Sequence, residues 1–160
     1  MIAMSSVLRI VARQIQDYAP LNELCGQNNA GLIIYVGHPG EGDLEPQDSL
    51  VRVSVVPDET GYNLGRTGNE DRECPIRITY DLTTQATQVD GARKEYIGAL
   101  LAHDVGETII QAIYEIGCLG DALRDAILRV DVADSWPVCK GEISIVFAFE
   151  RGLAFEAALE

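Results

Sequence analysis

The stretch EISIVFAF at residues 142–149 carries the strongest strand pattern in the chain and does most to decide the fold. Isoleucine, valine and phenylalanine fit a pleated, half-buried sheet surface well. A second stretch, IRITYDL at residues 76–82, alternates its aliphatic residues and Tyr80 with polar side chains. This two-residue period predicts a strand with one face against a core and the other toward water.

Three more stretches predict strands. Residues 30–37 (AGLIIYVG) are short, apolar and bounded by glycine, which favours a strand buried on both faces. Residues 50–56 (LVRVSVV) place three valines on one face, and residues 128–133 (LRVDVA) are a further predicted strand. We expect residues 50–56 to pair with residues 76–82 as an antiparallel hairpin whose strands are joined by a long loop.

Two stretches predict helices. Near the N-terminus, Ser5 and Ser6 are suitable N-cap residues for the near-helical apolar stripe that follows them. Residues 92–116 form a long apolar face with a helical period, and Asp90 is a plausible N-cap. A shorter helix is expected at residues 122–127, with Asp121 as its cap.

Two glycines lie inside the predicted long helix and bear on its geometry and packing. Gly98 and Gly106 each cost up to about 1 kcal/mol relative to alanine in a helix interior. Their presence therefore predicts either a kink or close packing against a neighbouring element.

The order of these elements predicts the fold class. Strands are grouped before and after one long helix, which is typical of α+β proteins rather than of alternating α/β folds. We expect a mainly antiparallel sheet of about five strands, packed on one face against the long helix and the N-terminal helix. Residues 1–160 are expected to form a single domain with a long loop at residues 57–74.

The charge of the chain argues against nucleic-acid binding. The net charge is −13, from 25 acidic against 12 basic residues, and Arg93-Lys94 is the only adjacent basic pair. Such a surface repels phosphate, so tight or specific DNA binding is not expected. An electronegative wall would nevertheless let DNA pass without sticking.

The cysteines and the hydropathy indicate the cell compartment. Cys25, Cys74, Cys118 and Cys139 lie far apart, without the spacing of a zinc or redox motif, so we expect buried thiols. No apolar run reaches the roughly 18 residues of a membrane span, and no signal peptide opens the chain. The sequence therefore predicts synthesis in a cytoplasm and no membrane partner.

No catalytic motif stands out, and we expect a protein that is not an enzyme and needs no cofactor. His103 and Glu107 stand four residues apart in the predicted long helix, and His38 is the only other histidine. A metal-dependent hydrolase using these three residues is one alternative function. A small adaptor module of the host cell is another.

The order of elements resembles that of the tail terminator, or tail-completion, proteins of long-tailed bacteriophages, and of related neck, connector and tail-tube proteins. The resemblance rests on residues 6–18, 30–37, 50–56 and 76–82, and on the closing stretch GEISIVFAFE at residues 141–150. It implies a virion protein that forms a homohexameric ring on the finished tail tube and joins it to the neck. DNA would pass through the centre of that ring.

Two polar segments are the predicted subunit or ring interface. Residues 58–73 (DETGYNLGRTGNEDRE) are rich in glycine and poor in apolar residues, and residues 38–45 carry glycines, a proline and acids. The candidate interface residues are His38, Glu41, Asp43, Asp58, Glu59, Tyr62, Arg66, Glu70, Asp71 and Arg72.

Overall fold

The structure is a computed structural model that describes residues 3–40, 47–58, 72–117, 119–132 and 137–149, without the side chain of Arg72. It has the predicted α+β class, with helices packed on a five-stranded sheet and a second, two-stranded sheet. The elements are α1 (Met4–Asp17), α2 (Ala19–Gln27), β1 (Gly31–Val36), β2 (Leu50–Pro57), β3 (Arg72–Thr83), β4 (Thr87–Asp90), β5 (Arg93–Tyr96), α3 (Ile97–Tyr114), the 3-10 turn η2 (Gly120–Ala122), β6 (Leu123–Asp131) and β7 (Val138–Phe149).

The large sheet is mainly antiparallel, with strand order β1-β2-β3-β7-β6. The predicted antiparallel hairpin of β2 and β3 is confirmed. The closing stretch lies in β7, which pairs with β3 on one side and β6 on the other, so the strongest strand pattern occupies an interior position of the sheet. Strand β1 pairs with β2 in parallel, which makes the sheet mixed at that edge.

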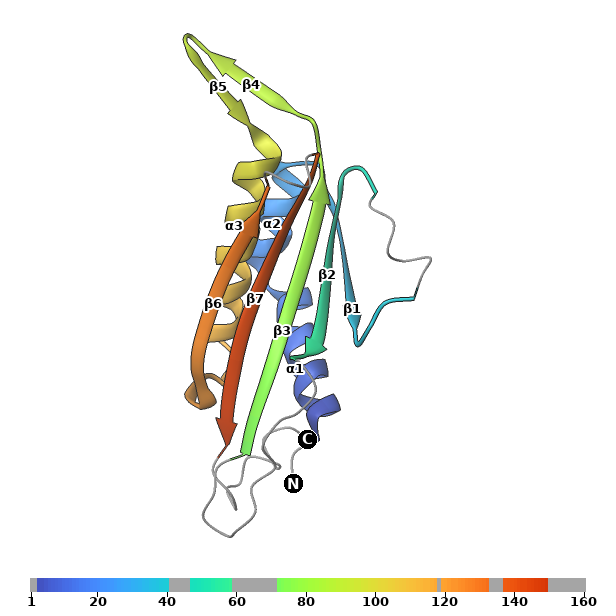
Figure 1. Cartoon of the computed structure of the whole chain (residues 1–160), viewed down its shortest axis with the longest axis vertical. Coiled ribbons are helices and arrows are strands. Elements are labelled where there is room, and N and C mark those ends of the chain that lie inside the picture. Colours follow the sequence, from blue (N-terminus) through green and yellow to red (C-terminus); the bar gives the residue numbers. More distant parts are fainter. Residues whose placement is uncertain (1–2, 41–46, 59–71, 118, 133–136, 150–160) are drawn as a thin grey trace.

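The helices cover one face of the sheet (Figure 1). Val7, Val11 and Ile15 of α1 are fully buried, as the apolar stripe in the sequence predicts. On the sheet, the same core contains the aliphatic side chains of β2, β3 and β7 that point toward the helices. The opposite face carries mostly polar side chains, and no described helix covers it.

Tyr80 joins the sheet to α3 through close packing at two glycines. A Cβ at Gly141 of β7 would overlap its ring, and a Cβ at Gly106 of α3 would clash with its hydroxyl oxygen and with the methyl groups of Leu128, so neither position has room for a side chain. The hydroxyl donates a hydrogen bond to the backbone oxygen of Ala102, 2.5 Å away. Burial raises the pKa of the Tyr80 hydroxyl above its ordinary value. Of the two alternatives for Gly106, close packing is therefore the one found.

Gly98 is also a close-packing position. A Cβ at Gly98 would lie 2.6 Å from the Cγ2 atom of Thr84 and 3.4 Å from the sulfur of Cys139. The residue lies in the first turn of α3, where the helix meets the ends of β3 and β7. The glycine therefore allows the start of α3 to approach the sheet.

Replacing Tyr80 with phenylalanine is expected to lower the free energy of unfolding by about 1 kcal/mol. The change removes a buried hydroxyl and its hydrogen bond to Ala102 while the ring stays in place. Urea denaturation would measure the loss. Tyr114→Phe is the control, because Tyr114 is exposed and should change stability by only a few tenths of a kcal/mol. Equal effects of the two variants would contradict the role given to the Tyr80 hydroxyl.

The start of the long helix was predicted wrongly. Helix α3 begins at Ile97 and not near residue 92, and its N-cap is Tyr96 rather than Asp90. The intervening residues form the β4–β5 hairpin, in which Asp90 pairs with Arg93 across the turn. Gly91 has φ +60°, so it supplies the left-handed conformation that a two-residue hairpin turn requires.

The predicted short helix at residues 122–127 is also wrong. A 3-10 turn, η2, covers Gly120–Ala122, and the chain then enters β6. Alanine, leucine and arginine at residues 122–124 have good helix propensity, but pairing of β6 with β7 outweighs this local preference. Strand β6 therefore starts five residues before the predicted strand at residues 128–133 and ends two residues earlier.

Two N-terminal expectations need correction. Helix α1 begins at Met4 after an Ala3 N-cap that makes no side-chain capping bond, so Ser5 and Ser6 lie inside the helix and are not its caps. A helix that the sequence did not suggest, α2, follows α1 directly. Pro20 falls in its first turn, where proline is tolerated because the missing N–H needs no partner there.

Strand β1 is an edge strand and is not buried on both faces. It pairs only with β2 among the described strands, and its residues alternate between exposed and half-buried. Its apolar composition indicated an interior strand, but composition does not show how many neighbours a strand has.

The cysteines that the structure describes are buried, as expected. Cys25, Cys74 and Cys139 lie in the core, whereas Cys118 falls outside the described residues. Burial raises the pKa of the Cys25 and Cys139 thiols. These two thiols are therefore held in their protonated, unreactive form.

Candidate subunit interface

The predicted interface residues that the structure describes lie at one end of the large sheet. Because β1 and β2 are parallel, both strands end there, and the Gly37 N–H donates to the Val55 oxygen at 2.9 Å. His38 follows β1 and is exposed, while the Asp58 N–H donates to the Pro75 oxygen at 2.9 Å. The backbone of Arg72 begins β3 at this same end. The other candidates lie outside the described residues: Glu41, Asp43, Glu59, Tyr62, Arg66, Glu70 and Asp71.

The β4–β5 hairpin forms a second candidate surface, at the opposite end of the molecule. It extends beyond the large sheet and beyond the start of α3 (Figure 1). Every residue of β4 is exposed, and β5 is exposed except for the half-buried Glu95. The hairpin therefore adds almost nothing to the core of its own chain.

One face of the hairpin is charged and internally paired. Asp90 and Arg93 lie opposite each other in the register, and the Arg93 guanidinium contacts the Asp90 carboxylate at 3.1 Å. The same guanidinium contacts the Glu95 carboxylate, also at 3.1 Å. This face thus satisfies its own charges, although exposed ion pairs add little stability.

The other face of the hairpin, called its apolar face below, carries two large apolar side chains that are both exposed. The alternation of a strand places Val89 and Tyr96 on this face with Lys94 and Thr87. Val89 is 66% exposed and Tyr96 is 46% exposed. The Lys94 ammonium lies 5.5 Å from the centre of the Tyr96 ring, a cation–π distance. The face therefore combines apolar area with one positive charge that contacts no carboxylate among the described residues.

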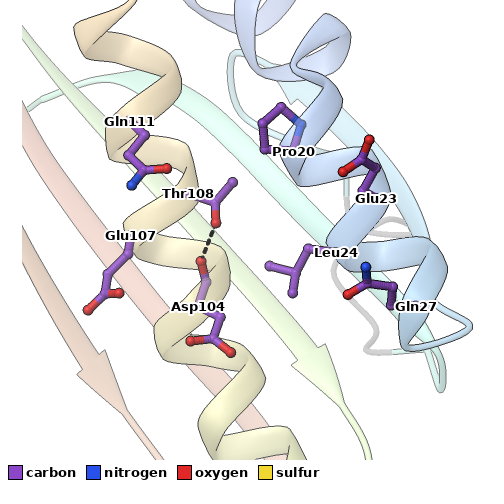
Figure 2. A pocket seen from close by; sticks show the side chains of 8 residues that line it. All are labelled: Pro20, Glu23, Leu24, Gln27, Asp104, Glu107, Thr108 and Gln111. Carbon is purple, nitrogen blue, oxygen red and sulfur yellow. Dashed lines mark hydrogen bonds between the residues drawn. The ribbon is translucent and has the colours of Figure 1, made fainter.

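A groove between α2 and α3 is the third candidate surface (Figure 2). Its volume is about 340 Å³. Leu24 points from α2 toward α3, and Pro20 lies one turn away on the same helix. The lining contains three acids and no base: Pro20, Glu23, Leu24, Gln27, Asp104, Glu107, Thr108 and Gln111.

The acids of the groove are exposed and keep their carboxylates available. Glu23 lies on α2, and Asp104 and Glu107 lie on α3, all in exposed positions. None of them forms an ion pair with a described residue. A ligand for this groove would combine apolar atoms for Leu24 and Pro20 with a positive charge for the acidic rim.

The residues of the alternative metal site are not assembled by the described fold. His103 and Glu107 are exposed on α3, and His38 follows β1. Among the described residues, no three histidine, cysteine, aspartate or glutamate side chains come together as a metal-ion site would require.

The hairpin is the part of the candidate interface that sequence reasoning missed. The signal was Gly91, because glycine at the first position of a two-residue loop is typical of a hairpin turn, and Asp90 and Arg93 pair on either side of Gly91 and Ala92. Asp90 was instead interpreted as a helix N-cap, a role that aspartate fills equally well.

Comparisons with known proteins do not assign the chain to a family. No protein-family model matches it, and no curated protein is significantly similar to it. Within the residues that the structure describes, no helix has the length and apolar character needed to cross a bilayer.

Proposed function

We propose that the protein is a structural virion component that forms a homohexameric ring at the head-proximal end of a phage tail. The ring terminates the tail tube, joins it to the neck and lets DNA pass through its centre. Its partners are other copies of the chain, the tail-tube protein and neck or connector proteins. No catalytic step and no cofactor belong to this function.

The observation that carries this proposal is the exposed β4–β5 hairpin. A two-stranded hairpin is marginally stable alone, and ordering its backbone costs about 1–2 kcal/mol per residue. Contacts within its own chain offset little of this entropic cost, because the residues of the hairpin stay exposed. A projecting arm with an uncovered apolar face is typical of an assembly contact.

Two further features support the phage setting. The described order of a helical N-terminus, strands, a long helix and closing strands is the order on which the tail terminator resemblance rests. The net charge of −13 suits a lumen through which DNA moves, because repulsion prevents the phosphates from adhering.

Native mass spectrometry and electron microscopy test this function. We expect hexameric rings, either of the purified chain at rising concentration or after addition of tail tubes whose ends are open. In the experiment with added tail tubes, the rings should occupy one end of each tube and stop further tube growth. A chain that stays monomeric in both experiments, and leaves tube growth unchanged, would overturn the proposal.

A further inference from the structure

We propose that the apolar face of the β4–β5 hairpin of one copy docks in the groove between α2 and α3 of the next copy. This inference rests on the proposed function. It names the two surfaces that would join neighbouring subunits of the proposed ring. The occupant of the groove is therefore a second copy of this chain.

The hairpin and the groove have complementary chemistry. The hairpin face offers Val89, the ring of Tyr96 and the Lys94 ammonium, which contacts no carboxylate of its own chain among the described residues. The groove offers Leu24 and Pro20 inside an acidic rim, and no base lines it. Apolar area would thus meet apolar area, and the lysine would meet carboxylates in a partly desolvated contact.

Charge makes this pairing selective. The chain carries 25 acids and 12 bases, so most pairs of surfaces from two copies repel each other. On the charged face of the hairpin, the one base, Arg93, is already engaged by the carboxylates of Asp90 and Glu95. The positive charge of Lys94 is therefore the one that this arm can direct at the acidic groove of a neighbour.

A hairpin cannot reach the groove of its own chain. It extends from the start of α3 away from the body, whereas the groove lies along the middle of that helix (Figures 1 and 2). The contact must then be made between copies and joins two different surfaces. Such head-to-tail contacts generate closed rings when the rotation between copies closes.

Paired variants at exposed positions test the inference. The hairpin variant carries Val89→Ser and Lys94→Ser, and the groove variant carries Glu23→Lys and Glu107→Lys. Each should raise the concentration for half-assembly by about tenfold or more, because each removes one side of the contact. Gln88→Ser, on the opposite face of the hairpin, is the matched control and should assemble like the wild type.

Mixing the two variants distinguishes a head-to-tail contact from other arrangements. The hairpin variant keeps an intact groove and the groove variant keeps an intact hairpin, so a 1:1 mixture should form heterodimers on native mass spectrometry. As a second readout, Val89→Cys mixed with Leu24→Cys should form a disulfide between copies under oxidation. Wild-type protein treated in the same way is the background.

The outcomes separate this inference from the proposed function. If both variants still formed rings like the wild type, and the two cysteine variants formed no disulfide between copies, the docking would be overturned. The proposed ring function would remain. Loss of assembly in the hairpin variant alone would overturn the groove as the docking site. A wild-type chain that remains monomeric with and without tail tubes would overturn both.

Discussion

Replacing Gly141 with alanine is expected to lower the free energy of unfolding by about 3 kcal/mol, the upper part of the usual range for overpacking. A Cβ at this position of β7 would overlap the ring of Tyr80, which lies opposite it on β3. The ring has little freedom to move, because its hydroxyl is hydrogen-bonded to the Ala102 oxygen and lies against Gly106. Chemical denaturation would measure the loss.

Gly26→Ala is the matched control for this variant. Gly26 lies in the last turn of α2, and no heavy atom stands within 4 Å of the place where its Cβ would be. Alanine should leave stability unchanged there or raise it by up to about 1 kcal/mol. If Gly141→Ala lowered the free energy of unfolding no more than Gly26→Ala does, this result would contradict the close packing of Tyr80 between α3 and β7.

Replacing Asp81 with alanine is expected to cost about 2 kcal/mol. Its carboxylate accepts two hydrogen bonds from Arg52, from Nε at 2.8 Å and from an Nη atom at 2.7 Å. The side chain of Arg52 is only 8% exposed although it lies on the sheet face without helices. The variant would leave this nearly buried guanidinium without its bidentate partner.

Asp90→Ala provides the comparison for an exposed ion pair. Its carboxylate contacts Arg93 at 3.1 Å, but the side chains are 74% and 66% exposed, so the change should cost less than about 1 kcal/mol. Thermal unfolding of both variants would give the difference. Replacing Arg52 and Asp81 together by leucine should recover part of the loss from Asp81→Ala, because the buried guanidinium is then removed together with its partner. Equal costs for Asp81→Ala and Asp90→Ala would contradict the assignment.

The sequence predicted the parts of the fold that a simple period controls. Strands β2, β3 and β7 and helix α1 each follow a two-residue or 3.6-residue pattern over several residues, and each was placed within a few residues. The pairing of β2 with β3 followed from their adjacency along the chain. Close packing at Gly106 was one of the two outcomes that a glycine inside a helix allows.

The errors arose where one residue type serves two roles. Asp90 suits a helix N-cap as well as a position beside a hairpin turn. Residues 122–127 have helical composition, and only the distant β7 makes β6 a strand. The edge position of β1 depends on the neighbours of the strand and could not be derived from its own residues.

The candidate interface could be predicted only in part. From the sequence, His38, Asp58 and Arg72 are interface candidates, and the structure adds that the parallel pairing of β1 and β2 brings them to one end of the sheet. The hairpin face and the α2–α3 groove could not be predicted, because α2 and β4–β5 were not recognised. Their complementarity also depends on side chains that are distant in sequence.

An electron-microscopy reconstruction of the chain assembled on tail tubes is the most direct test of the account. It should show six copies around a central channel, with Val89 and Lys94 of each copy seated between α2 and α3 of its neighbour. A map in which the chain is absent from the tubes, or in which every hairpin points into solvent, would contradict the account.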